Sequence, residues 1–155
     1  MKYISSGESH GESLMGILEG VPSNLKIDEE FINGQLKKRQ MGYGRSERME
    51  IESDRVKIIS GINNGYSTGN PIGLLIDNKA TNIKTDEIYR VRPGHGDLVG
   101  GIKYNHPGGR NVLERASARE TAMRVAIGSI CKLLLREVGI VIYGHVIQIG
   151  SISSS

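Results

Sequence analysis

The chain has 155 residues, a formal charge of +3 at neutral pH and a pI near 9.0, and this length predicts one domain. The single cysteine, Cys131, excludes an internal disulfide and suits a reducing compartment, by default the cytoplasm. The mild positive charge favours anionic ligands without requiring nucleic acid, and no apolar run reaches the roughly 18 residues of a membrane span. We therefore expect a soluble, unprocessed cytoplasmic protein that binds neither nucleic acid nor membrane.

The first part of the chain predicts a strand followed by a helix. The apolar run at 14–21 is closed by Pro22 and is typical of a strand. Asp28 is suited to cap a helix, because Glu29 and Glu30 follow it and basic residues occupy 37–39. The basic residues are therefore expected at the C-terminal end of this helix.

The middle of the chain predicts a loop and a strand-rich meander. Residues 41–50 have no apolar period, so they read as a loop that suits a substrate lid. Residues 51–62 and 73–77 are expected to form strands, and Asn-Asn-Gly at 63–65 is a turn signal between them. A glycine-rich turn at 91–97 is then expected, with a short helix running on to Tyr104.

The longest predicted helix begins at Ser117, which forms a capping-box pattern with Glu120. It should end near Val138, where Gly139 is suited to be the C-terminal cap. Residues 140–149 are dense in β-branched side chains and predict a strand.

Two histidines stand beside glycines in turns, where a ring could project into a pocket lined by backbone. His10 is a candidate general acid, although a histidine hydrogen-bonded within a turn has the same pattern. His95 offers the same choice, and Asp97 could orient its imidazole or pair with Arg92. His106 and His145 read as structural or solvated residues.

Five arginines lie beside predicted turns or helix ends, and guanidinium groups bind phosphate and carboxylate through paired hydrogen bonds. They are Arg39, Arg45, Arg92, Arg115 and Arg119. Each could be a solvated surface charge, but together they favour a polyanionic ligand. The helix start at Ser117 is a simple cap or a phosphate seat. The sequence contains no Walker loop, dinucleotide fingerprint or metal-ligand cluster, so we expect no metal.

Four segments, in this order and spacing, resemble the chorismate synthase family, and the resemblance runs through all 155 residues. They are Gly7 to Gly11, Arg39 to Arg45, Arg92 to Asp97, and Arg115 to Gly128. The resemblance implies an α+β fold in which a helical layer lies between antiparallel sheets. This chain would supply an incomplete version, residues 1–155 being the N-terminal portion of a single domain without an internal boundary.

The family is a lyase of the shikimate pathway, which leads to the aromatic amino acids. It converts 5-enolpyruvylshikimate 3-phosphate to chorismate by 1,4-elimination of phosphate, using reduced FMN without net redox change. NADPH reduces the flavin in some members, and others rely on a separate reductase. A cytoplasmic homotetramer is the assembly that the resemblance implies.

The resemblance also implies roles for individual residues. His10 would protonate the departing phosphate, and His95 would hold a proton near the reduced flavin. The residues that would contact the trianionic substrate or NADP are Arg39, Arg45, Arg92 and Arg119. The residues that would contact the flavin are Arg115, Ala116 and Ser117.

Two features depart from the family pattern. Gly96 stands where alanine is expected after the histidine, and the chain lacks the later family segment that holds an arginine-serine-aspartate motif and further flavin contacts. We therefore expect the chain alone to turn over no substrate and to expose apolar surface. Two alternatives remain open. One is a catalytically incomplete fragment that binds flavin or a phosphometabolite, and the other is a nucleic-acid binder, which the lack of aromatic residues among 37–39 disfavours.

Overall fold

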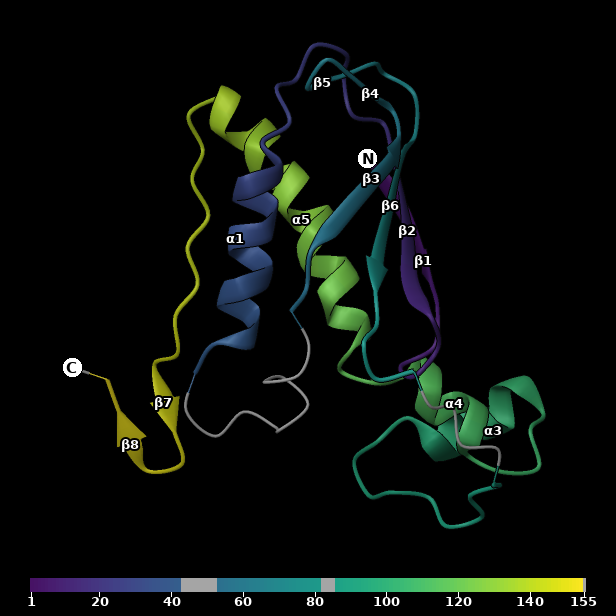
Figure 1. The fold of residues 1–155 in the computed structure, drawn as a ribbon. Coiled ribbons are helices and arrows are strands. Elements are labelled where there is room, and N and C mark those ends of the chain that lie inside the picture. Colours follow the sequence, from purple (N-terminus) through teal and green to yellow (C-terminus); the bar gives the residue numbers. More distant parts are fainter. Residues whose placement is uncertain (43–52, 82–85, 155) are drawn as a thin grey trace.

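A four-stranded antiparallel sheet and two helices packed on one of its faces form the main body of the protein (Figure 1). This is a computed structural model, and it describes residues 1–42, 53–81 and 86–154. The strands are β1 Lys2–Ser6, β2 Ser13–Glu19, β3 Val56–Ser60, β4 Ile62–Asn63, β5 Tyr66–Ser67, β6 Ile72–Asp77, β7 Gln148–Ile149 and β8 Ile152–Ser153. The helices are α1 Glu29–Gln40, α3 Asp97–Tyr104, α4 Arg110–Arg115 and α5 Glu120–Glu137. The predicted α+β class is confirmed.

The strands of the main sheet lie in the order β1-β2-β6-β3, and every neighbouring pair is antiparallel. Strand residues alternate between the two faces, so Leu14, Leu18 and Leu74 point toward the helices and are almost fully buried. Met15 and Ile17 lie on the opposite face and remain more than two-fifths exposed. The expected exposure of apolar surface is confirmed on this outer face.

Helix α1 begins as predicted, because the Asp28 carboxylate accepts a hydrogen bond of 2.9 Å from the backbone N–H of Phe31. Ile32 and Leu36, one turn apart, are fully buried against the sheet and α5. Gly16, in β2, lets α5 approach the sheet closely, since a Cβ on this residue would lie 2.5 Å from the Met123 sulfur.

The predicted end of α5 is confirmed, and its predicted start is wrong. The N–H groups of Gly139 and Ile140 bond back to Arg136 and Leu135, which is the usual glycine-terminated helix end. The helix begins at Glu120, however, and not at Ser117.

The predicted capping box between Ser117 and Glu120 does not form, because both side chains bond to other partners. The Ser117 hydroxyl accepts a 3.3 Å hydrogen bond from the N–H of Arg119, two residues on. The Glu120 carboxylate bonds to Ser5 and Arg124. Ser117 therefore lies in the turn between α4 and α5 and offers no helix N-terminus to a phosphate.

The strand predicted at 140–149 is also wrong, apart from the two residues of β7. Residues 140–147 form no ladder with any described strand, and they run as an exposed chain alongside α1 (Figure 1). β-propensity measures how side chains pack on a neighbouring strand, so β-branched residues without such a neighbour do not form a strand. His145 lies in this segment.

The middle of the chain agrees with expectation in part. Of the strand predicted at 51–62, β3 covers 56–60 and residues 53–55 are not in a strand, whereas β6 and α3 agree with the strand predicted at 73–77 and the helix predicted to run to Tyr104. The turn predicted at 63–65 joins β4 to β5, and Asn64 and Gly65 have φ of 49° and 80°, as a tight hairpin requires. The loop predicted at 41–50 falls outside the described residues from 43 onward. Within the part of the chain that the structure describes, no helix is long and apolar enough to cross a membrane.

Candidate active site

The turn between β1 and β2 carries His10, and its shape depends on Gly7. The φ of Gly7 is +107°, a value that side chains other than glycine rarely adopt. A Cβ at this position would also lie 2.5 Å from the carbonyl oxygen of Ser13 and 3.0 Å from the Cα of Leu14. Glycine therefore allows the chain to fold back tightly just before the histidine.

His10 pairs with Glu114, the residue before the last of α4. Its ring Nδ1 lies 2.9 Å from Oε2 and 3.2 Å from Oε1 of Glu114, and its backbone N–H donates to Oε2 at 3.1 Å. The Glu114 side chain is buried, whereas about a third of the His10 side chain is exposed. The histidine thus faces outward from a buried carboxylate.

Asn78 holds the same turn from the other side. It follows β6, and its amide nitrogen donates to the carbonyl oxygens of Glu8 and Gly11 at 3.2 and 2.8 Å. Its backbone N–H donates to the carbonyl of Glu12 at 2.9 Å. The Asn78 side-chain oxygen accepts a 2.6 Å hydrogen bond from Nε of Arg119, which links the histidine turn to an arginine cluster.

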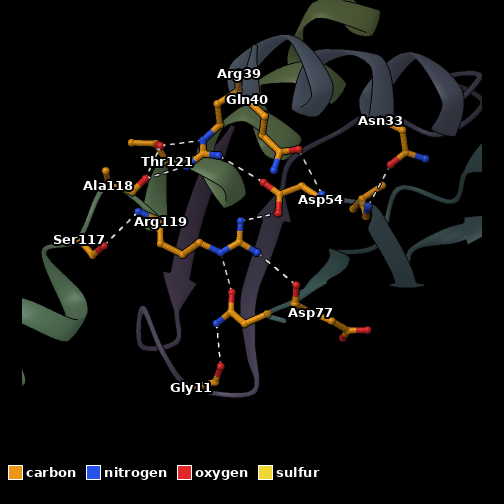
Figure 2. A network of polar contacts seen from close by, with 12 residues as sticks. Gly11, Asn33, Arg39, Gln40, Asp54, Asp77, Ser117, Ala118, Arg119 and Thr121 are labelled. Atoms are coloured by element: carbon orange, nitrogen blue, oxygen red, sulfur yellow. Dashed lines mark hydrogen bonds and ion pairs between the residues drawn. The ribbon is translucent and has the colours of Figure 1, made fainter. Parts of the chain in front are cut away.

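That cluster has Asp54 at its centre, with Arg39 and Arg119 on either side (Figure 2). Arg119 contacts one carboxylate oxygen through Nη1, and Arg39 contacts the other at 3.3 Å. Arg39 also donates to Thr121 and to the carbonyl of Ala118, at 2.9 and 3.0 Å. Asp54 and Arg119 are buried, so this network fixes the C-terminal end of α1 against the start of α5.

A second histidine cluster combines Arg92, His95 and Asp97. The sequence left open whether Asp97 pairs with Arg92 or orients the imidazole of His95, and in the structure it contacts both. Arg92 Nε and Nη2 donate to the two Asp97 oxygens at 2.8 Å, and Nδ1 of His95 lies 3.0 Å from Oδ1. The hydrogen bonds from Arg92 are the main reason that the pKa of Asp97 lies well below its usual range, despite opposing desolvation.

This lowered pKa predicts a pH dependence. A depressed carboxyl pKa stabilises the fold above the unfolded value of about 3.9 and loses that contribution as the pH falls toward the folded pKa. Arg92→Ala should raise the Asp97 pKa, so the stability difference between wild type and variant should be constant above about pH 5 and shrink below about pH 4. Urea unfolding at several pH values and ¹³C NMR of the carboxyl group measure this. Titration of wild-type Asp97 near pH 4 would contradict it.

A groove of about 430 Å³ runs between α3 and α4 and brings the predicted flavin segment next to the His95 loop. Its lining includes Gly96, Tyr104, His106, Arg115 and Ala116. A Cβ at Gly96 would lie 3.6 Å from that of Ala116, which is ordinary contact, so alanine would also fit there. The space at position 96 therefore accepts either glycine or alanine.

Arg115 reaches from this groove to the first strand. Its Nη2 donates to the carbonyl and to the hydroxyl of Ser5, both at 2.8 Å, and lies 3.8 Å from Glu120. Its Nη1 is buried and has no hydrogen-bond partner among the described residues. An unpartnered buried donor is costly, so this atom is suited to meet a ligand acceptor.

The structure thus places His10 beside Glu114, Arg39 and Arg119 around Asp54, and Arg92 and His95 around Asp97. Arg115 and Ala116 line the groove between α3 and α4. Arg45 lies outside the described residues, and Ser117 lies in a turn beside the arginine cluster. Reasoning from the sequence missed Asp54, Asn78 and Glu114. A signal existed for two of them, because Asn78 directly follows a predicted strand and Glu114 precedes the Arg115 segment, whereas Asp54 lies within the strand predicted at 51–62. No group of three or more metal-ligating side chains occurs in residues 1–42, 53–81 and 86–154.

The protein thus combines an antiparallel α+β fold with two histidine–carboxylate pairs and an arginine cluster around the buried Asp54. The comparisons with known proteins specify the family. The family model described as chorismate synthase matches residues 1–155, and the chain therefore belongs to the chorismate synthase family.

Curated relatives support this assignment. Chorismate synthase of Thermoanaerobacter pseudethanolicus is 56% identical over 158 residues, which cover 99% of this chain and 45% of the relative. Chorismate synthase of Carboxydothermus hydrogenoformans is 51% identical, with coverage of 97% and 42%. That of Staphylococcus aureus strain MRSA252 is 52% identical, with coverage of 98% and 44%. The chain spans less than half the length of these relatives.

A solved structure supports the fold. A crystal structure of chorismate synthase aligns with a TM-score of 0.70 at 45% sequence identity. The alignment covers 89% of this chain and 34% of that one.

Proposed function

We propose that this chain carries the N-terminal part of a lyase site that converts 5-enolpyruvylshikimate 3-phosphate to chorismate and phosphate. The observation that carries the proposal is the His10 turn, which is held by Glu114 on one side and by Asn78 on the other, with Arg119 bonded in turn to Asn78. A fixed proton donor that is linked through Asn78 to the arginine cluster suits the departure of phosphate, because the leaving oxygen must be neutralised as charge develops.

In this proposal the arginines bind the anionic groups of the substrate or of NADP. Arg39 and Arg119 are held in place by Asp54, so their guanidinium groups need little reorganisation when an anion arrives. Arg92 is fixed by Asp97, and Arg45 is assigned to the same task from the family resemblance. Removal of any one should weaken substrate binding.

His95 is proposed to hold a proton near the flavin. Its Nδ1 lies 2.9 Å from Nη2 of Arg92 and 3.0 Å from Oδ1 of Asp97, and these two neighbours fix the ring orientation. The neighbouring groove supports this arrangement, since Gly96 contributes to its wall together with Arg115 and Ala116.

Reduced FMN is the proposed cofactor, and the groove is its proposed site. Two observations support this: the walls are mainly apolar, and Arg115, which lines the groove, has a buried Nη1 without a hydrogen-bond partner among the described residues. Arg115, Ala116 and Ser117 would hold the cofactor. When bound, reduced flavin would supply electron density to the elimination without being consumed, so the reaction has no net redox change.

The remaining family properties belong to the same proposal. NADPH is the candidate reductant of the flavin, the cytoplasm is the proposed compartment, and the complete protein is a proposed homotetramer. Residues 1–155 are proposed to form the N-terminal portion of a single domain. The outer sheet face, which exposes Ile4, Met15, Ile17 and Ile59, would then be covered in the assembly.

The first test measures FMN binding and chorismate formation with photoreduced FMN under anaerobic conditions. It compares the chain with a chimera that joins it to the remainder of the Thermoanaerobacter relative. We expect FMN binding without turnover by the chain alone, and chorismate formation by the chimera. His10→Ala in the chimera should lower turnover by about 10²–10⁴-fold, the usual contribution of a general acid. A folded chimera that binds FMN but forms no chorismate would favour the alternative, a fragment that only binds flavin or a phosphometabolite.

A further inference from the structure

We propose that Glu114 is the positioning residue of His10, an inference that rests on the proposed role of His10 as the acid. A carboxylate accepts hydrogen bonds and cannot donate them, so the ring nitrogen that faces it must carry a hydrogen. Both oxygens of Glu114 lie within 3.2 Å of Nδ1. Glu114 therefore fixes the Nδ1–H tautomer of His10.

This tautomer decides which proton is exchanged. With Nδ1–H held by the carboxylate in both charge states of the ring, the proton given up is the one on Nε2. The Nε2–H bond breaks, an O–H bond forms on the departing phosphate oxygen, and the ring changes from cation to neutral. Glu114 neither gains nor loses a proton in this step.

Glu114 positions the backbone as well as the ring. Its carbonyl oxygen accepts a 2.9 Å hydrogen bond from the N–H of Ser9, and its carboxylate accepts from the N–H of His10 at 3.1 Å. One residue further on, Arg115 bonds to Ser5 on β1. Because these contacts join the same two stretches of chain, the acid and the proposed flavin segment have a fixed relative position.

The surroundings of the carboxylate support a role beyond packing. Glu114 is buried, and a buried carboxylate is costly unless charged or polar groups satisfy it. Besides His10, the charged group that faces it is Arg110, one helical turn earlier, with 4.0 Å between Nη1 and Oε1. The shorter and better-directed contacts are those to His10.

The tautomer can be measured directly in the whole chain. Long-range ¹H–¹⁵N correlation spectra of ¹⁵N-histidine protein, recorded above the ordinary titration range of imidazole, distinguish Nδ1–H from Nε2–H rings. We expect His10 to be the Nδ1–H tautomer, with its signal assigned by its loss in His10→Gln. A predominantly Nε2–H ring in the wild type would overturn the inference, whether or not any Glu114 variant folds.

The matched variants are Glu114→Gln and, as control, Glu137→Gln at the exposed end of α5. Glutamine presents both donors and acceptors, so it should release His10 into a mixture of tautomers, whereas the control should leave the ring unchanged. Retention of the Nδ1–H tautomer in a folded Glu114→Gln protein would overturn the inference.

Kinetics in the chimera separate this inference from the proposed function. Glu114→Gln should lower kcat by on the order of 10²-fold and change KM by less than about twofold, because it misplaces a proton and leaves the arginines in position. An active chimera with an Nε2–H ring at His10 would defeat the positioning role alone. An inactive chimera with the Nδ1–H ring would defeat the proposed reaction and leave the tautomer assignment standing.

Discussion

Replacement of Asp54 by alanine should lower the free energy of unfolding by about 3–5 kcal/mol, because it leaves a buried guanidinium group without its carboxylate. Asp54 is buried, it contacts both Arg39 and Arg119, and its own N–H donates to Gln40 at 3.3 Å (Figure 2). In a chain of this size, each kcal/mol lowers the melting temperature by roughly 2–4 °C. Urea unfolding followed by circular dichroism measures the loss.

The control is an exposed ion pair. Arg55 and Glu30 lie 2.9 Å apart, but both side chains are largely exposed, so Glu30→Ala should change stability by less than about 1 kcal/mol. Equal effects of Asp54→Ala and Glu30→Ala would show that the buried cluster contributes no more than a surface pair.

Replacement of Gly7 by alanine should cost about 3 kcal/mol or more, the sum of backbone strain and overpacking. The φ of +107° is unfavourable for alanine, and the added Cβ would clash with the Ser13 carbonyl and the Leu14 Cα. The backbone of Ser13 and Leu14 is held in the β2–β6 ladder, so it cannot move aside as a flexible side chain could. The same variant should shift the NMR signal of His10, because the turn that presents the ring is displaced.

Gly11 supplies the matched control within the same turn. A Cβ there would lie 3.4 Å from the nearest atom, Oε2 of Glu8, and its φ is outside the left-handed region. Gly11→Ala should therefore leave stability within about 1 kcal/mol of wild type. If Gly7→Ala proved as mild as Gly11→Ala, the proposed tightness of the turn would be wrong.

The sequence by itself determined the elements whose signals are local. A cap at Asp28, a turn glycine at Gly65 and a C-terminal glycine at Gly139 each act within a few residues, and each was placed correctly. Short apolar runs bounded by turn signals likewise placed β2 and β6. The family motifs also singled out His10, His95 and the arginines before any geometry was available.

Only the tertiary structure decided what depends on distant partners. The site residues have partners that lie between 15 and 104 residues away along the chain. Glu114 is the partner of His10, Asp54 that of Arg39 and Arg119, and Asn78 a second partner of Arg119. Distant partners also explain why two local predictions were wrong: the helix start at Ser117 and the strand at 140–149. Glu120 bonds to Ser5 of β1, and 140–147 have no described strand to pair with. Local propensity is a weak preference, and long-range hydrogen bonds and ion pairs outweigh it once the chain is folded.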